Sequence, residues 1–334
     1  MKNILLVFLF ALMIAGCSTK RQYFEPETTN GNIKFNGSIS SDIKEVGLFG
    51  ASLKNGQVIS IDGVESNKIL DKEDYFIGKF DNKYVVITKN GSLNIKLEDG
   101  TIFYEKILPS MIATASLEDD SLAIVTADNT LYLIEMSSDK TLYLQKMDDI
   151  SAIDSRIAIP YFLGSLVIFP TLDGKLTIVD RYSGDLIRNV VVSAEKHFNN
   201  LIFLDVVGDR MFAATAKRAI SINPSGINYI DEDIKDAVLL KDRFFIFTKD
   251  GTVIMTDLNL KVIKEKKFPF AMFSGVVLSD DTLNIIEKKG YLIKTNLNLE
   301  NIEYLTLPDE IDSSIFIGKD KMFYENKIID FSNN

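Results

Sequence analysis

The sequence of 334 residues contains no tryptophan, one cysteine and one histidine. A single cysteine excludes an intrachain disulfide and a zinc site built from several cysteines. Positive charge is also scarce, since 37 Lys and Arg residues stand against 47 Asp and Glu residues and the formal net charge is −10. Nucleic-acid binding needs clustered Lys and Arg to meet the phosphates. This balance therefore argues against a nucleic-acid partner.

Long hydrophobic runs are confined to the N-terminus. Residues 1–16 read MKNILLVFLFALMIAG, where Lys2 precedes an apolar stretch over 4–14 that is too short for a membrane-spanning helix. The stretch ends at Ile14-Ala15-Gly16-Cys17, which contains the chain's single cysteine. This string resembles the lipobox of bacterial lipoproteins. The resemblance implies that residues 1–16 are a signal peptide and that Cys17 carries acyl chains such as palmitate. An ordinary signal peptide that happens to contain a cysteine is the alternative.

Anchoring through Cys17 would set the location of the protein. Two or three acyl chains hold a protein stably on a membrane, unlike a single chain. In lipoproteins of Gram-negative bacteria an Asp after the cysteine usually means retention in the inner membrane, and here Ser18 stands in that place. The resemblance therefore implies the outer membrane, on its periplasmic side. Residues 17–30 are polar and without period, which predicts a tether of roughly 20 Å.

What the chain does contain is one pattern that occurs eight times. A short apolar segment reaches a turn, and a second apolar segment follows it. The steps from one turn to the next run from 33 to 45 residues. The turns are Asn55-Gly56, Asn90-Gly91, Asp128-Asn129, Asp173-Gly174, Lys217-Arg218, Asp250-Gly251, Lys289-Gly290 and the weaker Glu325-Asn326. A period in this range, with strand patterns and no helical ones, is typical of the blades of a β-propeller.

The fourth copy shows the internal order of the repeat. It reads TLDGKLTIVDRYSGDLIRN over 171–189, where Asp173-Gly174 is a two-residue hairpin signal and Ser183-Gly184 turns the chain again. A lone hairpin cannot bury its own faces, so each unit has to pack against its neighbours. Further strands before and after this hairpin bring the unit to four. The sequence predicts an all-β, eight-bladed propeller with four antiparallel strands per blade, formed by residues 31–334 as a single domain.

The two ends of this domain fit a closed ring. The eighth unit has strand patterns over 314–317, 321–324 and 327–331 and then lacks a fourth strand. Residues 32–36, NIKFN, alternate apolar and polar side chains before the first unit. We expect this N-terminal strand to pair with residues 328–331 and close the ring, which removes the exposed edges of an open array.

The turn pattern also carries a family resemblance. Val179-Asp180-x-x-Ser183-Gly184-x-Leu186 and its partial copy Leu97-x-Asp99-Gly100-x-Ile102 are similar to PQQ-like repeats. Together with the lipobox and eight units, they resemble the BamB-like outer-membrane lipoproteins. The resemblance implies a non-catalytic scaffold in outer-membrane β-barrel assembly, with a BamA-type barrel protein or its client chains as partner. A PQQ-dependent dehydrogenase is disfavoured, because that class is much longer and stacks its cofactor on a Trp. We therefore expect no cofactor.

Two connections between units are longer than the rest, and extra loop length in a scaffold of short turns is a place to look for function. They cover residues 148–158 and 193–200. Because consecutive blades are neighbours, the two should lie side by side on one face of the ring. This arrangement predicts a partner-binding patch made of Ile153, Arg156, His197 and Phe198.

Catalytic and metal-binding chemistry finds little material in the sequence. A Ser-His-Asp triad would have to use His197, which lies in a polar loop with Glu195 and Asn199 and is best interpreted as solvated, so we expect no nucleophile–base pair. The acidic clusters lack the spacing and glycine of a calcium loop, so no metal site is expected. We therefore predict a non-enzyme. The alternative is a periplasmic enzyme or small-ligand binder that uses the mouth of the central channel.

Overall fold

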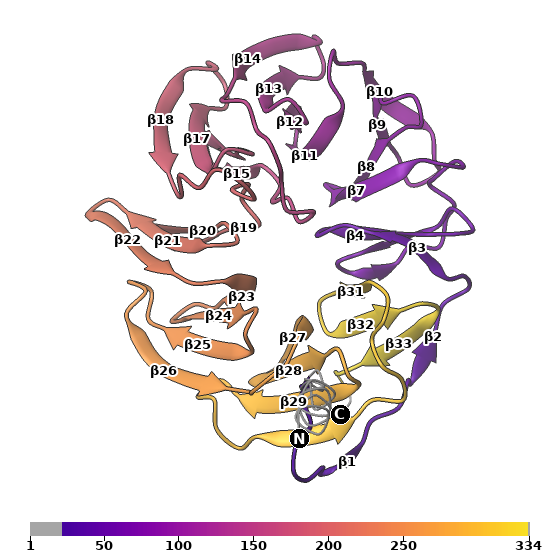
Figure 1. Ribbon diagram of the computed structural model, residues 1–334. Coiled ribbons are helices and arrows are strands. Elements are labelled where there is room, and N and C mark those ends of the chain that lie inside the picture. The colour runs from indigo at the N-terminus through magenta and orange to yellow at the C-terminus, as the bar shows by residue number, and fades with distance from the viewer. Residues whose placement is uncertain (1–21, 333–334) are drawn as a thin grey trace, which may run out of the picture.

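The computed structural model describes residues 22–332, so the predicted signal peptide and Cys17 lie outside the described residues. The described residues form strands, turns and bends and no helix. A membrane-crossing helix, which would have to be long and apolar, is accordingly not found in this part of the chain. The strands make eight sheets that stand around a common centre as the blades of a ring (Figure 1).

The strands follow the blades in chain order. Blades 1 and 2 hold β3 (Ile43–Val46), β4 (Gly50–Leu53), β5 (Val58–Ser60), β6 (Gly63–Val64), β7 (Tyr75–Phe80), β8 (Lys83–Ile87), β9 (Leu93–Lys96) and β10 (Ile102–Lys106). Blades 3 and 4 hold β11 (Ile112–Glu118), β12 (Ser121–Thr126), β13 (Thr130–Glu135), β14 (Lys140–Lys146), β15 (Tyr161–Leu163), β16 (Leu166–Pro170), β17 (Lys175–Asp180) and β18 (Leu186–Val191).

The second half of the ring continues in the same way. Blades 5 and 6 hold β19 (Phe203–Val207), β20 (Arg210–Ala214), β21 (Arg218–Asn223), β22 (Gly226–Asp231), β23 (Ile234–Leu239), β24 (Phe244–Thr248), β25 (Thr252–Thr256) and β26 (Val262–Lys267). Blades 7 and 8 hold β27 (Phe273–Ser279), β28 (Thr282–Glu287), β29 (Tyr291–Asn296), β30 (Glu303–Thr306), β31 (Ile315–Ile317), β32 (Lys321–Tyr324) and β33 (Lys327–Asp330), joined by β1 (Gly31–Asn32) and β2 (Gly37–Ser38).

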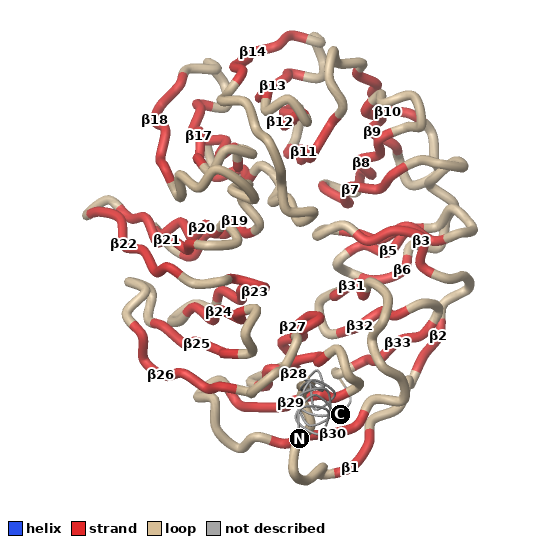
Figure 2. The backbone as a smooth tube through the Cα atoms, viewed as in Figure 1, coloured by secondary structure: helices blue, strands red, loops and turns tan. Residues whose placement is uncertain are grey.

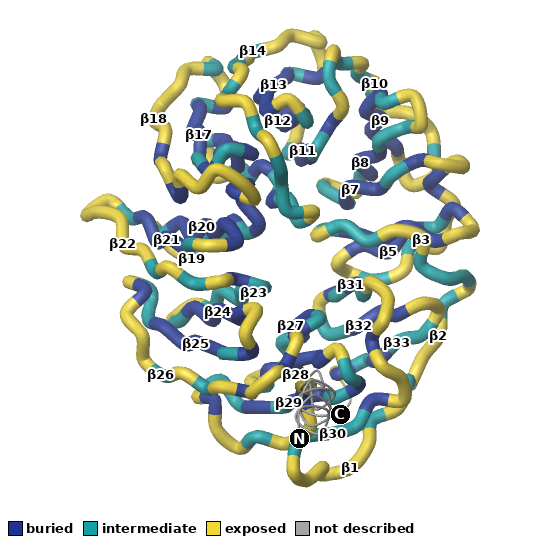
Figure 3. Tube along the Cα trace, in the orientation of Figure 1, coloured by how far each residue is buried: buried dark blue, intermediate teal, exposed yellow. Residues whose placement is uncertain are grey.

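The predicted fold is confirmed: the ring has eight blades of antiparallel strands, and each of the eight predicted turns joins the second and third strands of a blade. Within a blade the first strand lies nearest the centre of the ring, and the fourth lies at the rim (Figure 2). The middle strands are buried on both sides, as in β12 and β13, because neighbouring blades pack against each sheet. Exposed residues collect toward the rim (Figure 3).

The N-terminal segment closes the ring, but further along the chain than the sequence predicts. β2 (Gly37–Ser38) is the fourth strand of blade 8 and pairs with β33 at Gly37↔Ile328. The predicted pairing strand, residues 32–36, is mostly a crossing between blades. The reason is that β1 (Gly31–Asn32) is already paired, parallel to β30, as a fifth strand of blade 7. The chain therefore has to cross from blade 7 to blade 8 before it reaches β33.

The predicted tether also differs from the structure. Phe24 lies within residues 17–30, yet its side chain is only 5% exposed. It packs among Phe268, Tyr291 and Tyr304, with ring centroids 5.6 to 6.4 Å away. An aromatic ring gains more from this contact than from water, so the chain is held to blade 7 from Phe24 onward. The predicted tether therefore does not extend past Phe24.

Strand order gives the ring two unlike faces. Turns between second and third strands share one face with the connections that lead from each blade to the next, and we call this the connection face. Turns between first and second strands and between third and fourth strands lie on the opposite face, which we call the turn face. In blade 4, for example, Asp173-Gly174 lies on the connection face, and Ser183-Gly184 lies on the turn face.

Candidate partner-binding face

The two long connections lie side by side on the connection face, as the sequence predicts. The hydroxyl of Ser151 is 2.7 Å from Nδ1 of His197, and the backbone N–H of Phe198 donates to the carbonyl of Ala152 at 3.0 Å. Phe198 has a φ of 55°, in the left-handed region. The hydrogen bond to Ala152 therefore fixes a strained backbone, and Phe198 is 53% exposed.

A buried amide joins the two connections more firmly. Asn200 is fully buried. Its Oδ1 accepts the N–H of Asp154 at 2.6 Å, and its Nδ2 donates to the carbonyls of Asp154 and Arg156 at 3.2 and 2.7 Å. One side chain thus satisfies three backbone groups of the neighbouring connection, which fixes the relative position of both.

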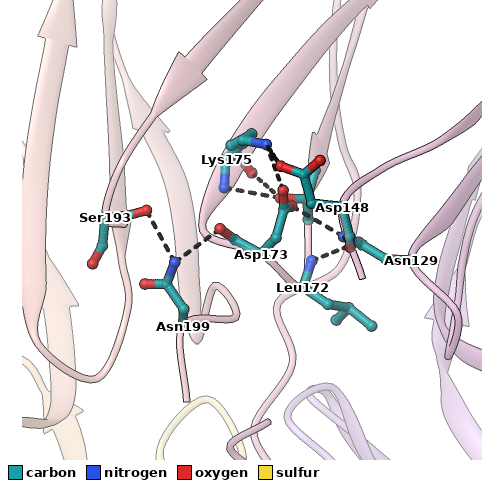
Figure 4. Close-up of polar contacts among 8 residues, drawn as sticks. Asn129, Asp148, Leu172, Asp173, Lys175, Ser193 and Asn199 are labelled. Carbon is teal, nitrogen blue, oxygen red and sulfur yellow. Dashed lines mark hydrogen bonds and ion pairs between the residues drawn. The ribbon is translucent and has the colours of Figure 1, made fainter. Parts of the chain in front are cut away.

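A second set of polar contacts ties the turns of blades 3 and 4 together (Figure 4). Asn129, in the turn of blade 3, is fully buried and has a φ of 62°. Its Nδ2 donates to the carbonyl of Asp148 and to Oδ1 of Asp173, both at 3.0 Å, and its Oδ1 accepts the N–H of Leu172 at 2.8 Å. This amide fixes the start of the first long connection against the turn of blade 4.

The same turn holds the second long connection. Nδ2 of Asn199 donates to the carbonyls of Asp173 and Ser193 at 2.8 and 3.0 Å (Figure 4). Gly174 leaves room for this contact, because a Cβ on it would lie 2.2 Å from Nδ2 of Asn199 and 2.5 Å from the Ser193 carbonyl. The glycine of the predicted Asp-Gly turn therefore serves a close approach as well as the hairpin.

The charges in this network are paired. Lys175 Nζ lies 2.7 Å from Oδ2 of Asp173 and also forms an ion pair with Asp148. Burial alone would raise the pKa of Asp173, but hydrogen bonds from Lys175, Thr171 and Asn129 outweigh burial and lower its pKa. Hydrogen bonds to Asp148 and Asp173 raise the pKa of Lys175. Both groups therefore stay charged at neutral pH, and neither is poised as a general base or acid.

The four residues of the predicted patch separate into two pairs. His197 and Phe198 are exposed on the connection face. Arg156 instead donates from Nε and Nη2 to the carboxylate of Asp154 at 2.9 and 2.6 Å and from Nη1 to the carbonyl of Lys235 on β23. Ile153 packs against the core between blades 3 and 4. The structure thus brings the loops together but turns Ile153 and Arg156 inward.

The inward turn of the first connection shapes an apolar cavity. Between β14 and β15 the chain runs to the middle of the ring (Figures 1 and 2). A recess of about 340 Å³ lies beside it, lined mainly by apolar side chains of the first three blades and by Ile153, Ile157 and Ile159 of the connection. The sequence did not predict that this connection runs to the middle of the ring. The connection contacts backbone groups and apolar side chains, and neither kind of contact leaves a pattern in the sequence.

Few side chains on the connection face are arranged for catalysis or metal binding. Ser151 and His197 do form a nucleophile–base pair, which corrects the expectation that none exists. Both residues are exposed, and within residues 22–332 no carboxylate is hydrogen-bonded to the other ring nitrogen of His197. A catalytic serine needs a base that is itself oriented by a third group. The described residues also contain no group of three His, Cys, Asp or Glu side chains that could hold a metal ion.

The amides that organise the face were missed at the sequence level. Asn129 takes the turn position that glycine fills in most copies, and asparagine tolerates positive φ there. The sequence could therefore have singled out this residue. Asn199 and Asn200 end the second connection and carry no pattern that separates them from solvated loop residues.

Comparison with known proteins places the fold among propellers. No family model matches the chain. BamB from Moraxella catarrhalis superimposes with a TM-score of 0.67 and 15% identity, over 87% of this chain and 98% of that one. The fold is shared with BamB. The C-terminal WD40 domain of Sif2 also superimposes, with a TM-score of 0.63 and 11% identity over 92% of this chain and 98% of that one. At these identities the likeness concerns the fold alone.

Two curated relatives are similar along the sequence. Both carry the name plasminogen-binding protein PgbB, from Helicobacter pylori strains J99 and 26695. They are 29% and 28% identical to this chain, over 99% and 98% of it and over 71% and 70% of their own length. This chain thus shares its fold with BamB and is similar in sequence to two proteins that are named for plasminogen binding.

Proposed function

We propose that the protein is a non-catalytic, protein-binding propeller, lipid-anchored at Cys17 to the periplasmic side of the outer membrane, where it takes part in β-barrel protein assembly. A BamA-type barrel protein or its client chains would be the partner. The observation that carries the proposal is the connection face, where buried amides hold two adjacent connections in place and an aromatic side chain stands exposed. The likeness of the fold to BamB supports it.

The geometry suits binding because the face is ordered before a partner arrives. Asn200 and Asn129 fix the connections through backbone hydrogen bonds, so little conformational entropy is left to lose on association. Phe198 is 53% exposed in this ordered region. Large aromatic side chains carry much of the binding energy at protein interfaces. Ile153 and Arg156 would contribute indirectly, by keeping the first connection in its inward course.

A second candidate function is plasminogen binding at the cell envelope. The observation that favours it is sequence similarity, since the two relatives named for plasminogen binding are 29% and 28% identical to this chain, compared with 15% for BamB. In this case the same propeller would present its surface to plasminogen. The connection face could serve either partner.

A matched pair of variants tests the first function. Phe198→Asp places a charge on the exposed surface of the second long connection, and Phe270→Asp is its control in the connection between blades 6 and 7. Phe270 has a φ of 64° and is 51% exposed, compared with 55° and 53% for Phe198. Full-length protein is cross-linked in membranes, purified and probed for the BamA-type barrel protein, with immobilised plasminogen as the second bait.

The outcomes separate the candidates. Loss of the barrel protein from Phe198→Asp alone, with an unchanged melting temperature, supports assembly through this face. Capture of plasminogen without the barrel protein favours the second function. Capture of neither by the wild-type chain contradicts both. Cys17→Ser should leave the protein uncleaved or release it from the membrane, and normal acylation and retention of that variant would contradict the lipid anchor.

A further inference from the structure

The first described residues are held at one definite place on the ring. Phe24 is buried among Phe268, Tyr291 and Tyr304. The neighbouring Tyr23 lies under Nζ of Lys289, which is 5.9 Å from the ring centroid. Phe24 and Tyr23 are thus received by Phe268, Tyr291, Tyr304 and Lys289 of blades 6 and 7, and we call the pocket that these four residues form the aromatic socket. It fixes where the chain leaves the propeller toward Cys17.

The aromatic socket belongs to the connection face. Lys289 lies in the turn between the second and third strands of blade 7, and Tyr291 begins β29 directly after it. Phe268 follows β26, and its N–H donates to the carbonyl of Gly251, in the corresponding turn of blade 6, at 2.8 Å. The chain therefore leaves from the same face that carries the connections over 148–158 and 193–200.

The following residues keep this exit in place. The N–H of Asn30 donates to the carbonyl of Tyr304 at 2.7 Å, and its Oδ1 accepts the N–H of Tyr304 at 2.9 Å. β1 then continues the pairing along β30. The segment is thus held by the socket at one end and by strand pairing at the other.

The distance from the socket to the lipid attachment point is short. Seven residues lead from Cys17 to Phe24, and seven residues span at most about 25 Å. The seven residues of β27 extend for about 23 Å across blade 7. The turn face could therefore meet the bilayer only with every residue of this segment fully extended along the blade, whereas the connection face has no such requirement.

We propose that the connection face is turned toward the membrane and that its partner is the exposed part of a protein embedded in that membrane. The inference rests on the lipid anchor of the proposed function and adds the orientation. The bilayer surface itself is not the partner, because a chain with a net charge of −10 gains nothing from anionic headgroups. A membrane protein would find the two ordered connections within its reach.

Energy transfer from each face to the membrane tests the orientation. Full-length acylated protein is reconstituted in vesicles that contain an acceptor-labelled lipid. Acylation occupies Cys17, so an introduced cysteine is the sole free thiol for the donor dye. Lys217→Cys places the dye on the connection face, in the turn between the second and third strands of blade 5. Asp209→Cys places it on the turn face, in the turn between the first and second strands of the same blade. Both positions are exposed. We expect clearly higher transfer from Lys217→Cys.

Two further variants test the cause. A Gly/Ser insertion of about 20 residues after Thr19 keeps the anchor and the socket but lengthens the link, and Phe24→Asp empties the socket. Both should bring the two transfer efficiencies close together. Equal transfer in the original chain or higher transfer from Asp209→Cys would overturn the orientation. A difference that survives both variants would overturn the short link and the socket as its cause. Failure of the acylated protein to stay on the vesicles would overturn the lipid anchor itself, and the orientation with it.

Discussion

The two faces of the ring are built from different kinds of contact. On the connection face, asparagine side chains bind the backbone of long connections, as Asn200 does for residues 154–156. On the turn face, arginines join neighbouring blades across short turns. Arg210 of blade 5 donates to the carbonyl of Leu258 in blade 6, and Arg243 of blade 6 repeats this toward Leu297 in blade 7. Both faces therefore join neighbouring blades, the connection face mainly through buried amides such as Asn129 and the turn face through arginines.

A single methyl group at Gly174 should have the largest effect on the connection face. Gly174→Ala places a Cβ 2.2 Å from Nδ2 of Asn199 and 2.5 Å from the Ser193 carbonyl, at a φ of 85°. We expect a loss of about 3–4 kcal/mol in the free energy of unfolding, because overpacking and backbone strain add. Gly164→Ala in the same blade, on the turn face, has no atom within 4 Å and should cost about 1–2 kcal/mol. Equal losses in urea unfolding would contradict the close packing of the second connection.

Removal of an arginine should weaken the turn face. Arg181 is 4% exposed and donates to Glu118, Asp119 and the hydroxyl of Ser121 in blade 3. We expect Arg181→Met to cost about 2 kcal/mol, since Ser121 and part of Glu118 lose a charged donor. The exposed Arg188 of β18 provides the control, and Arg188→Met should change stability by less than about 0.5 kcal/mol. If both variants melt at the same temperature, the arginine contact does not hold blades 3 and 4 together.

Loss of the buried amide should loosen one face without opening the ring. Asn200→Ala removes three hydrogen bonds, and we expect a cost of about 1–2 kcal/mol together with faster hydrogen exchange at the amides of residues 154–156. Asn298→Ala on the turn face removes only its contact with Arg243 and should leave those amides protected. Unchanged exchange in Asn200→Ala would show that the inward course of the first connection does not depend on this side chain.

The smallest effect is expected from a group that lies between the faces. Burial raises the pKa of Asp205 on β19, and the N–H of Val206 only partly opposes this. The folded state then holds the proton more tightly than the unfolded chain. The stability that this provides is present below pH 3.8, the ordinary pKa, and is lost as pH rises through the raised pKa. At pH 7, Asp205→Asn should raise Tm by less than about 2 °C, with no gain at pH 3.5. Asp209→Asn in the neighbouring turn is the control, and an equal gain there would contradict the effect of burial.

The turns were predictable because their signals are local. Asp173-Gly174 and its copies set hairpins through their own backbone preferences, so strand count and ring size followed from sequence alone. The inward course of residues 148–158 was not predictable, because Arg156 binds the backbone carbonyl of Lys235. Every residue has such a carbonyl, so the sequence does not mark this one as a partner. Phe24 was missed for a related reason: one aromatic residue in a polar segment shows nothing of the pocket that receives it.

Ring closure has a consequence for the time course of folding. The side chain of Asn36 exchanges hydrogen bonds with the backbone of Asp330, 294 residues later in the chain. At about 5–20 residues per second, ribosomes need roughly 15–60 s to make the intervening chain. Contacts so distant in sequence form slowly even once both partners exist. Blade 8 is therefore the last to be completed, and until then the rim of β33 and the flank of blade 1 remain open to other chains. The unfinished ring therefore has to be kept from associating with other chains throughout that interval.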